Sequence, residues 1–449
     1  MTATTLPRFP EGFLWGVSSS AYQIEGAVDA DGRGPSTWDT FAAKPGTVLG
    51  GDTGRTATDH YHRYREDVAL MAELGVDAYR FSVAWPRVFP TGRGDVNTAG
   101  LDFYDRLVDE LCANDIAPAV TLYHWDTPQA LEDDGGWLNR DTAYRFADYA
   151  EAVVARLGDR VRMWMPLNEP MVVTLFGYAV GAHAPGRELM FEALPVAHHQ
   201  LLAHGLATRA LRAGGATSVG IANHHVPVRP ASDSPADRSA ADLYDTLVND
   251  MFAAPVLTGR YPTDELAAAM PGPVTEDLEI IGTPLDWYGV NYYLPSKVAA
   301  PSGRETVVDG VTMPSGLPFD FPAIEGYPVT DFGWPVVPDG LRETLAMLAD
   351  RYGERLPPVY ITESGCAYHD EVHDKRRIDF LDGHIRAAHQ AIADGIDVRG
   401  YFVWSIVDNF EWAAGYSQRF GLVHVDYDTL ARTKKDSFHW YRDLIRAQR

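Results

Sequence analysis

Cysteine is scarce in this sequence: among 449 residues there are only two, Cys112 and Cys366. A chain of this length can bury enough apolar surface to fold without disulfides, and so few cysteines fit a reducing compartment. The first residues contain no basic segment followed by an apolar one, so we expect no secretory signal peptide. No apolar run approaches the roughly 18 residues that a membrane-spanning helix needs. These absences predict a soluble, cytoplasmic protein that does not bind membranes.

Positive charge is also in short supply. There are 38 Lys and Arg residues against 62 Asp and Glu, which gives a formal net charge of −24. Such an acidic excess repels the phosphate backbone, so a nucleic acid is not expected as a partner. The hydrophobic fraction of 46% is that of an ordinary globular protein. Composition leaves the oligomeric state open.

Short apolar runs alternate along the chain with longer stretches of helical periodicity. Two of the helical stretches, residues 101–111 and 144–157, place their apolar side chains on one face of a helix. Eight strands that alternate with helices predict an α/β fold, a single-domain (β/α)8 barrel over residues 1–449 with elaborated loops. The expected strands are residues 13–18, 78–83, 118–123, 162–167, 218–223, 287–292, 358–362 and 400–404.

A long connection, residues 294–340, departs from this alternation. It is rich in proline and glycine and carries several aromatic side chains. Because it follows the sixth strand, it should rise beside the mouth of the barrel, where active sites of this fold lie. We expect it to form part of a substrate entrance, with a surface insertion of no consequence as the alternative. The aromatic residues are Phe319, Phe321, Tyr327, Phe332 and Trp334.

Two glutamates close two of the predicted strands. Glu169 follows the strand at 162–167, and Glu363 follows the strand at 358–362. Burying a carboxylate at the tip of a hydrophobic strand costs free energy, so its presence there suggests a functional role. Glycoside cleavage uses such a pair, because one carboxylic acid protonates the leaving oxygen while a carboxylate faces the anomeric carbon. Taken alone, each motif could equally be a surface salt bridge at a strand end.

The surrounding segments resemble those of glycoside hydrolase family 1 over nearly the whole chain. The resemblance implies a (β/α)8 barrel, hydrolysis of β-glycosides with retention of configuration, and no cofactor. The matching segments occur in the family's order. They are FLWGVSSSAYQIEG (13–26), YRFSVAWPR (79–87), YHWDTP (123–128), NEP (168–170), NYY (291–293), ITE (361–363), VWSIVDNFEW (403–412) and FGLVHVDY (420–427).

The resemblance also implies a role for each matched residue. Glu169 would be the acid/base and Glu363 the nucleophile, with Arg80 and Tyr293 beside the nucleophile. The residues expected to bind the sugar are Gln23, His124, Asn168, Asn291, Trp404, Glu411 and Trp412. For Trp404, plain core packing is the alternative.

Physical chemistry supports several of these roles. A fixed positive charge on Arg80 favours the ionised form that a nucleophile needs, and Tyr293 can donate a hydrogen bond to the same carboxylate. Asn168 can reach the sugar 2-hydroxyl, where hydrogen bonds strengthen in the transition state. The sequence departs from the family pattern at Pro166, commonly threonine, and at Ser364, commonly asparagine. Neither departure removes a reacting group.

We expect no metal site and no cysteine nucleophile. The histidine pairs at 60 and 62, 198 and 199, and 224 and 225 lack the carboxylate or cysteine that would complete a zinc pattern. Cys366 lies close to Glu363 in the sequence but has no evident histidine partner, so we interpret it as a packing residue.

The expected activity is that of a β-glucosidase acting on terminal non-reducing β-D-glucosyl residues of small glycosides, such as cellobiose and aryl glucosides. The ranking of glucose, galactose and fucose stays open, as does transglycosylation. A 6-phospho-β-glucosidase would need a cation where this chain has Glu411 and Trp412. A sugar-binding protein without catalysis is disfavoured by the presence of both Glu169 and Glu363.

Overall fold

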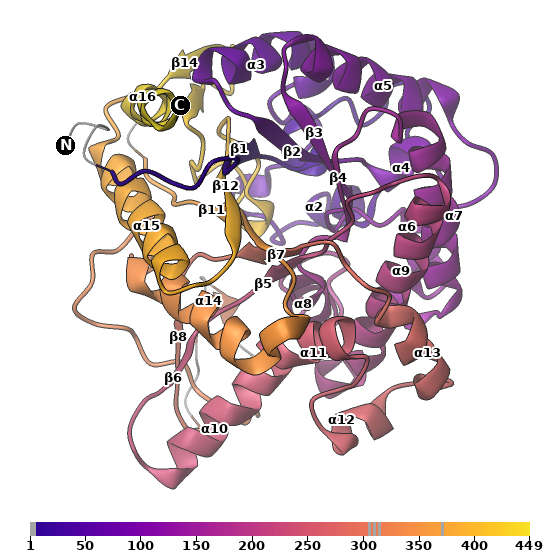
Figure 1. Cartoon of the computed structure of the whole chain (residues 1–449). Coiled ribbons are helices and arrows are strands. Elements are labelled where there is room, and N and C mark those ends of the chain that lie inside the picture. Colours follow the sequence, from indigo (N-terminus) through magenta and orange to yellow (C-terminus); the bar gives the residue numbers. More distant parts are fainter. Residues whose placement is uncertain (1–5, 304–306, 309–310, 313–315, 370–371) are drawn as a thin grey trace.

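Eight parallel strands form the centre of the molecule. The computed structural model describes residues 6–303, 307–308, 311–312, 316–369 and 372–449. The strands pair in the order β4-β3-β2-β1-β12-β11-β7-β5, with helices around them (Figure 1). They are β1 (Leu14–Ser18), β2 (Ala78–Ser82), β3 (Ala117–Tyr123), β4 (Met163–Leu167), β5 (Ala222–His224), β7 (Tyr288–Asn291), β11 (Val359–Ser364) and β12 (Val398–Trp404). Each lies within two residues of an expected strand at its ends, except at the start of β5.

The ring closes between β4 and β5 through isolated bridges. Trp164 pairs with Val219 and Asn168 with Ala222, both in parallel. The backbone N–H of Glu169 donates to the carbonyl of Ala222 over 2.8 Å. Because the segment before Ala222 makes only such bridges, the regular strand begins four residues later than the sequence predicts. The predicted (β/α)8 barrel is confirmed.

The helices lie outside the strands, and several short elements decorate the loops. Figure 1 shows α3, α5, α7, α9, α14, α15 and α16 around the ring. The α-helices are α1 (Ala21–Ile24), α2 (Thr37–Ala42), α3 (His60–Leu74), α4 (Trp85–Val88), α5 (Thr98–Ala113), α6 (Gln129–Asp133), α7 (Asp141–Leu157), α8 (Pro170–Val172), α9 (Leu194–Ala213), α10 (Pro235–Asp245), α11 (Met251–Thr258), α12 (Asp264–Ala269), α13 (Val274–Ile281), α14 (Pro338–Tyr352), α15 (Lys375–Ala393) and α16 (Asp436–Gln448). No helix in the described part of the chain is long and apolar enough to cross a membrane.

The remaining elements are short. Three two-stranded sheets lie in the connections, formed by β6 with β8, β9 with β10 and β13 with β14. Their bounds are β6 (Val228–Pro230), β8 (Ser296–Val298), β9 (Val307–Val308), β10 (Val311–Thr312), β13 (Val423–Val425) and β14 (Arg432–Lys434). The 3-10 and π-helical turns are η2 (Leu49–Gly51), η3 (Gly136–Leu138), η4 (Val173–Ala179), η5 (Met190–Ala193), η6 (Thr246–Asp250), η7 (Gly353–Arg355) and η8 (Trp412–Ala414).

The two helices predicted from periodicity are present as α5 and α7. All the apolar positions expected on one face of α5 are buried, as the 3.6-residue period requires. In α7 the apolar positions expected on one face turn inward from Phe146 onward. The prediction for Tyr144 is wrong, since its side chain is 44% exposed. Arg140 stands over its ring at 5.8 Å. A tyrosine next to an arginine can remain at the surface, because its ring and hydroxyl tolerate water.

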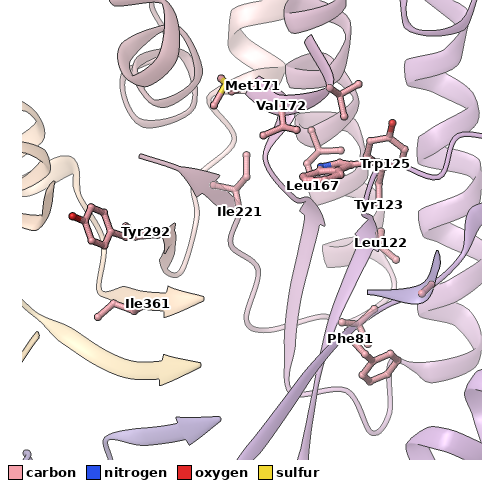
Figure 2. Close-up of a cluster of buried hydrophobic side chains, with 14 of the residues drawn as sticks. Phe81, Leu122, Tyr123, Trp125, Leu167, Met171, Val172, Ile221, Tyr292 and Ile361 are labelled. Atoms are coloured by element: carbon pink, nitrogen blue, oxygen red, sulfur yellow. The ribbon is translucent and has the colours of Figure 1, made fainter. Parts of the chain in front are cut away.

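Alternation along the strands divides the core into two layers. Phe81, Leu122 and Leu167 belong to the large apolar cluster that packs the strands against the helices (Figure 2). A separate small cluster, with Met165 and Trp287 among its members, fills the inside of the barrel. Trp287 needs the space left by a glycine, because a β-carbon at position 220 would lie 2.4 Å from its ring. The interior is therefore closed below the catalytic end.

Candidate active site

A cavity of about 760 Å3 opens at the carboxyl ends of the strands. Seven of the side chains predicted from sequence line it, and the other four each form a hydrogen bond with one of these seven. The lining residues are His124, Glu169, Tyr293, Glu363, Trp404, Glu411 and Trp412. Phe332 and Trp334 of the long connection also line the cavity, so the described part of this connection contributes to its wall. That substrates enter past it stays a prediction. Tyr327 of the same connection is 41% exposed.

Glu363 lies in β11 with both carboxylate oxygens engaged. Arg80, on β2, donates to Oε1 over 2.5 Å, and the hydroxyl of Tyr293 donates to Oε2 over 2.6 Å. Burial and the negative charge of Glu363 hold the pKa of Tyr293 well above its usual value, so its hydroxyl stays a donor. Two donors on one carboxylate favour its ionised form and fix its orientation.

Glu169 follows β4 at the start of α8 and has different surroundings. Its backbone is left-handed, with φ of 45°, so the chain turns sharply at the strand tip. The side-chain amide of Asn291 donates to Oε1 over 2.9 Å. Nδ1 of His224, the last residue of β5, lies 3.5 Å from the same oxygen. Among the described residues, no arginine forms an ion pair with Glu169 as Arg80 does with Glu363.

A chain of hydrogen bonds joins the surroundings of the two glutamates. The side-chain oxygen of Asn168 accepts from the guanidinium of Arg80 and from the amide of Asn291. Asn168 also donates to Nε2 of His124 over 3.2 Å. Burial, with a contribution from Arg80, lowers the pKa of His124 well below its usual value, so the ring is neutral and can accept. Arg80, Asn168 and Asn291 thus position the two carboxyl groups from behind.

Burial and the hydrogen-bond donors act in opposite directions on the pKa of Glu363. Burial raises the pKa of Glu363 to about 7 and the charge of Glu169 adds to this, whereas Arg80 and Tyr293 oppose the rise. Both oxygens of Glu363 already accept hydrogen bonds from strong donors, so a proton there would displace one of them. The donors on Glu363 therefore favour its ionised form against the effect of burial.

Glu411 provides a third buried carboxyl on the wall formed by the loop after β12. Its Oε2 accepts from Asn409 over 3.0 Å and from Gln23 of α1 over 3.3 Å. Burial raises the pKa of Glu411 to about 8, and the charges of Glu363 and Glu169 contribute. Asn409 and Gln23 offset part of this rise. A buried carboxyl held between two amides can make directed hydrogen bonds to hydroxyl groups of a ligand.

Aromatic rings form a further part of the wall. The ring of His124 stacks with that of Trp404, with centroids 5.6 Å apart, and with that of Trp412, with centroids 5.9 Å apart. Trp404 also packs against Phe420 and the cavity, so it is both a core residue and a lining residue. Flat apolar faces beside hydrogen-bonding groups suit a sugar ring, which is apolar on its faces and polar at its edge.

Two residues that touch this chemistry were not predicted. His224 was considered only as a metal ligand, yet it faces Glu169. Asn409 lies within the matched segment 403–412, two residues before Glu411, and that position was its only signal. The partner of His224 is set by how the ends of two strands pack, and that of Asn409 by the conformation of the loop it shares with Glu411.

The histidines considered for a metal have other partners. His60 bonds with Asp67 over 2.7 Å, and His198 with Asp277 over 2.9 Å. His225 turns away from the cavity to Asn249, at 3.0 Å. Within the described ranges, no group of three or more His, Cys, Asp or Glu side chains is placed to hold a metal ion.

Cys366 is fully buried, and burial raises the pKa of its thiol to about 12. Such a thiol is a poor nucleophile at neutral pH, because the thiolate is the reactive form. This supports the interpretation of Cys366 as a packing residue.

Comparisons with known proteins agree with this geometry. The family model described as "Glycosyl hydrolase family 1" matches residues 6–449. A thermostable β-glucosidase B from Thermobispora bispora is 49% identical over 98% of this chain and 90% of its own length. A bifunctional β-D-glucosidase/β-D-fucosidase from Bifidobacterium breve is 45% identical over 97% of this chain and 98% of its own. The crystal structure of a psychrophilic β-glucosidase from Micrococcus antarcticus superposes with a TM-score of 0.94, at 48% identity and 100% coverage of both chains.

Proposed function

Because the chain belongs to glycosyl hydrolase family 1, we propose that it is a retaining β-glucosidase, which removes terminal β-D-glucosyl residues from small glycosides by double displacement. The observation that carries the proposal is the contrast between the two buried glutamates. Glu363 accepts from Arg80 and Tyr293, whereas Glu169 contacts Asn291 and His224. An arginine and a hydroxyl that donate to one carboxylate suit a nucleophile, and the other glutamate, which lacks these donors, is assigned as the acid.

In the first step, Glu363 attacks the anomeric carbon while Glu169 protonates the leaving oxygen. The C–O bond to the aglycone breaks, the aglycone departs as an alcohol, and a covalent glycosyl ester forms on Glu363. Retention requires the two carboxyl groups to lie about 5–5.5 Å apart, since no water stands between nucleophile and sugar. The ester removes the negative charge of Glu363, which favours the ionised form of Glu169.

In the second step, Glu169 takes a proton from water, and the resulting hydroxide attacks the anomeric carbon of the ester. Glu363 leaves as a carboxylate, and the sugar is released as the β anomer. No step requires a cofactor. An acceptor alcohol can replace water in this step, which would make the reaction a transglycosylation.

We assign the sugar hydroxyl groups to Glu411, Gln23, His124 and Trp412, and the 2-hydroxyl to Asn168. The proposed substrates are cellobiose and aryl β-glucosides, and the Bifidobacterium breve relative makes β-fucosides a reasonable second class. A 6-phosphosugar is disfavoured, because its phosphate would meet a third carboxyl, Glu411, rather than a cation. The scarcity of cysteine supports the cytoplasm as the compartment.

Two variants and one external nucleophile test the roles of the glutamates. In Glu169→Gln, the first step should slow by about 10²–10⁴-fold for an alkyl β-glucoside, whose leaving group needs a proton. The first step should change little for a dinitrophenyl glucoside. Because Glu169 is also the base of the second step, the covalent intermediate should accumulate as a burst of dinitrophenol. Glu192→Gln, at an exposed position, is the matched control.

Azide then separates the two roles by stereochemistry. It needs no base, so it should rescue Glu169→Gln and give the β-glycosyl azide after two displacements. In Glu363→Ala it should replace the nucleophile and give the α-glycosyl azide after one displacement. Proton NMR of the products distinguishes the anomers. The same anomer from both variants would show that the acid and nucleophile are wrongly assigned.

A further inference from the structure

A second cavity lies beside the active-site cavity and encloses about 90 Å3. We refer to it as the apolar chamber. It lies among η4, η5, η6, α11 and the long connection, and its lining includes Leu247, Phe252 and Phe319. Thr174 and Tyr244 are the lining residues with a polar side-chain atom. The hydroxyl of Thr174 donates to the carbonyl of Pro170 over 2.8 Å, so it is already satisfied by the backbone.

The apolar chamber shares a wall with the active-site cavity. Four residues line both cavities, namely Met171, Leu175, Phe176 and Tyr244. Met171 is the second residue after Glu169, and Leu175 and Phe176 belong to η4, the next element in the chain. Figure 2 shows Met171 and Val172 beyond the end of the strand that carries Leu167. The shared wall therefore begins directly at the acid/base glutamate.

The place of the shared wall in the barrel indicates which end of a bound glycoside it faces. The shared wall follows β4, whereas Glu411 and Trp412 follow β12. In the strand order, β4 and β12 are four places apart in a ring of eight, so they lie opposite each other. If Glu411 holds the sugar hydroxyl groups, the wall after β4 faces the leaving group, to which Glu169 delivers the proton. This step rests on the proposed function.

The size and chemistry of the apolar chamber limit what can enter it. An engineered cavity of roughly 150 Å3 in another protein holds one benzene molecule. At about 90 Å3, the chamber has room for less than a ring, which favours the end of a slender aliphatic chain. A charged group would lose its hydration there among side chains that are almost all apolar. The exposed Phe191, at the lining, adds apolar surface that such a chain could cover.

We propose that the apolar chamber receives the aliphatic tail of the aglycone, which makes this enzyme selective for glucosides of medium-chain alcohols. Burial of each methylene lowers the free energy of the bound substrate and of the transition state alike. The gain should therefore appear in KM, with kcat nearly constant.

A series of n-alkyl β-D-glucosides tests this, from methyl through butyl and hexyl to decyl. The leaving alcohols beyond methyl have nearly the same acidity, so chain length changes binding and leaves the chemistry constant. We expect kcat/KM to rise by about fourfold for each methylene that enters the chamber, then to level off when the chamber is full. Hydrolysis of the methyl glucoside reports the proposed function alone. A flat series with an active methyl glucoside would overturn the chamber proposal and leave the proposed function intact.

Leu247→Trp should block the chamber from a position that is only partly buried and does not line the active-site cavity. The rise with chain length should then be lost, while methyl glucoside hydrolysis is unchanged. Leu243→Trp is the matched control, since Leu243 is 40% exposed on the neighbouring α10 and lines neither cavity. Leu247→Ala is the reciprocal variant, and it should move the plateau to longer chains. An unaltered chain-length profile in both Leu247 variants would mean that the tail lies elsewhere.

Discussion

Replacing Tyr293 by phenylalanine should move the acidic limb of the pH profile. As the proposed nucleophile, Glu363 would attack only when ionised, so activity should be lost as the pH falls through its pKa, which burial raises to about 7. The Tyr293 hydroxyl opposes that rise by donating to the carboxylate over 2.6 Å. A hydrogen bond to a charged group contributes about 1.5–3 kcal/mol. At about 1.4 kcal/mol per pH unit, its loss should raise the limb by about 1–2 pH units.

The assay is kcat/KM for 2,4-dinitrophenyl β-D-glucoside between pH 5 and 9. This leaving group needs no proton, so the acidic limb reports the nucleophile and not the acid. On the limb the variant should be about 10–100-fold slower than the wild type, with a much smaller difference at the plateau. Tyr292→Phe is the control, because its hydroxyl donates to the carbonyl of Val337 over 2.7 Å and not to Glu363. A Tyr293→Phe limb that coincides with that of Tyr292→Phe would refute the reasoning.

Two further substitutions test the sugar pocket and the scaffold. Glu411→Ala should lower kcat/KM for aryl glucosides by about 10²-fold, since the hydrogen bonds of this buried carboxyl to the sugar are lost and Asn409 and Gln23 lose their acceptor. A loss below threefold would show that Glu411 does not touch the sugar. Asp408→Asn should lower the free energy of unfolding at pH 7 by about 3–5 kcal/mol in urea denaturation, because it leaves Lys435 and Arg419, each 2.9 Å from the carboxylate, without a buried counter-ion. Burial alone would raise the pKa of Asp408, but these cations hold it well below its usual range. The wild-type advantage should therefore be complete above about pH 5 and shrink as the pH falls, and a pH-independent difference would contradict the ion-pair interpretation.

The ring of strands could be predicted because each strand is a short buried run between helical stretches. The prediction was wrong at two places, and in each the contacts made in the folded chain are the cause. The segment before β5 reads as a strand, yet it is held to β4 only by isolated bridges such as that between Trp164 and Val219. Tyr144 fits the apolar face of α7 by spacing, but the side chain stays at the surface beside Arg140. The spacing of apolar residues does not indicate whether a strand pairs regularly, nor whether an arginine on the preceding turn will contact a tyrosine.

The two glutamates and their neighbours could be placed in one site because short motifs at strand ends carry them. The contact of His224 with Glu169 could not be predicted, since it joins the ends of two different strands. The contact of Asn409 with Glu411 depends on the conformation of the loop that both residues share, which the motif does not specify. The apolar chamber lay further out of reach. Its walls come from η4, η5, η6 and the long connection, and no single segment among these has a pattern that indicates a cavity. Spacing along a chain predicts the faces of elements, but the space enclosed between elements depends on their packing.

The pairing of β1 with β12 has a consequence for synthesis on the ribosome. Strands β1 to β4 can pair in the order in which they emerge, because neighbours in the sequence are neighbours in the ring. The other edge of β1 pairs residue by residue with β12, from Leu14 with Gly400 to Ser18 with Trp404. That edge stays open until nearly the whole chain has left the exit tunnel. The nascent enzyme therefore carries an unpaired, apolar strand edge for most of its translation, the kind of surface that chaperones bind and that joins one unfinished chain to another.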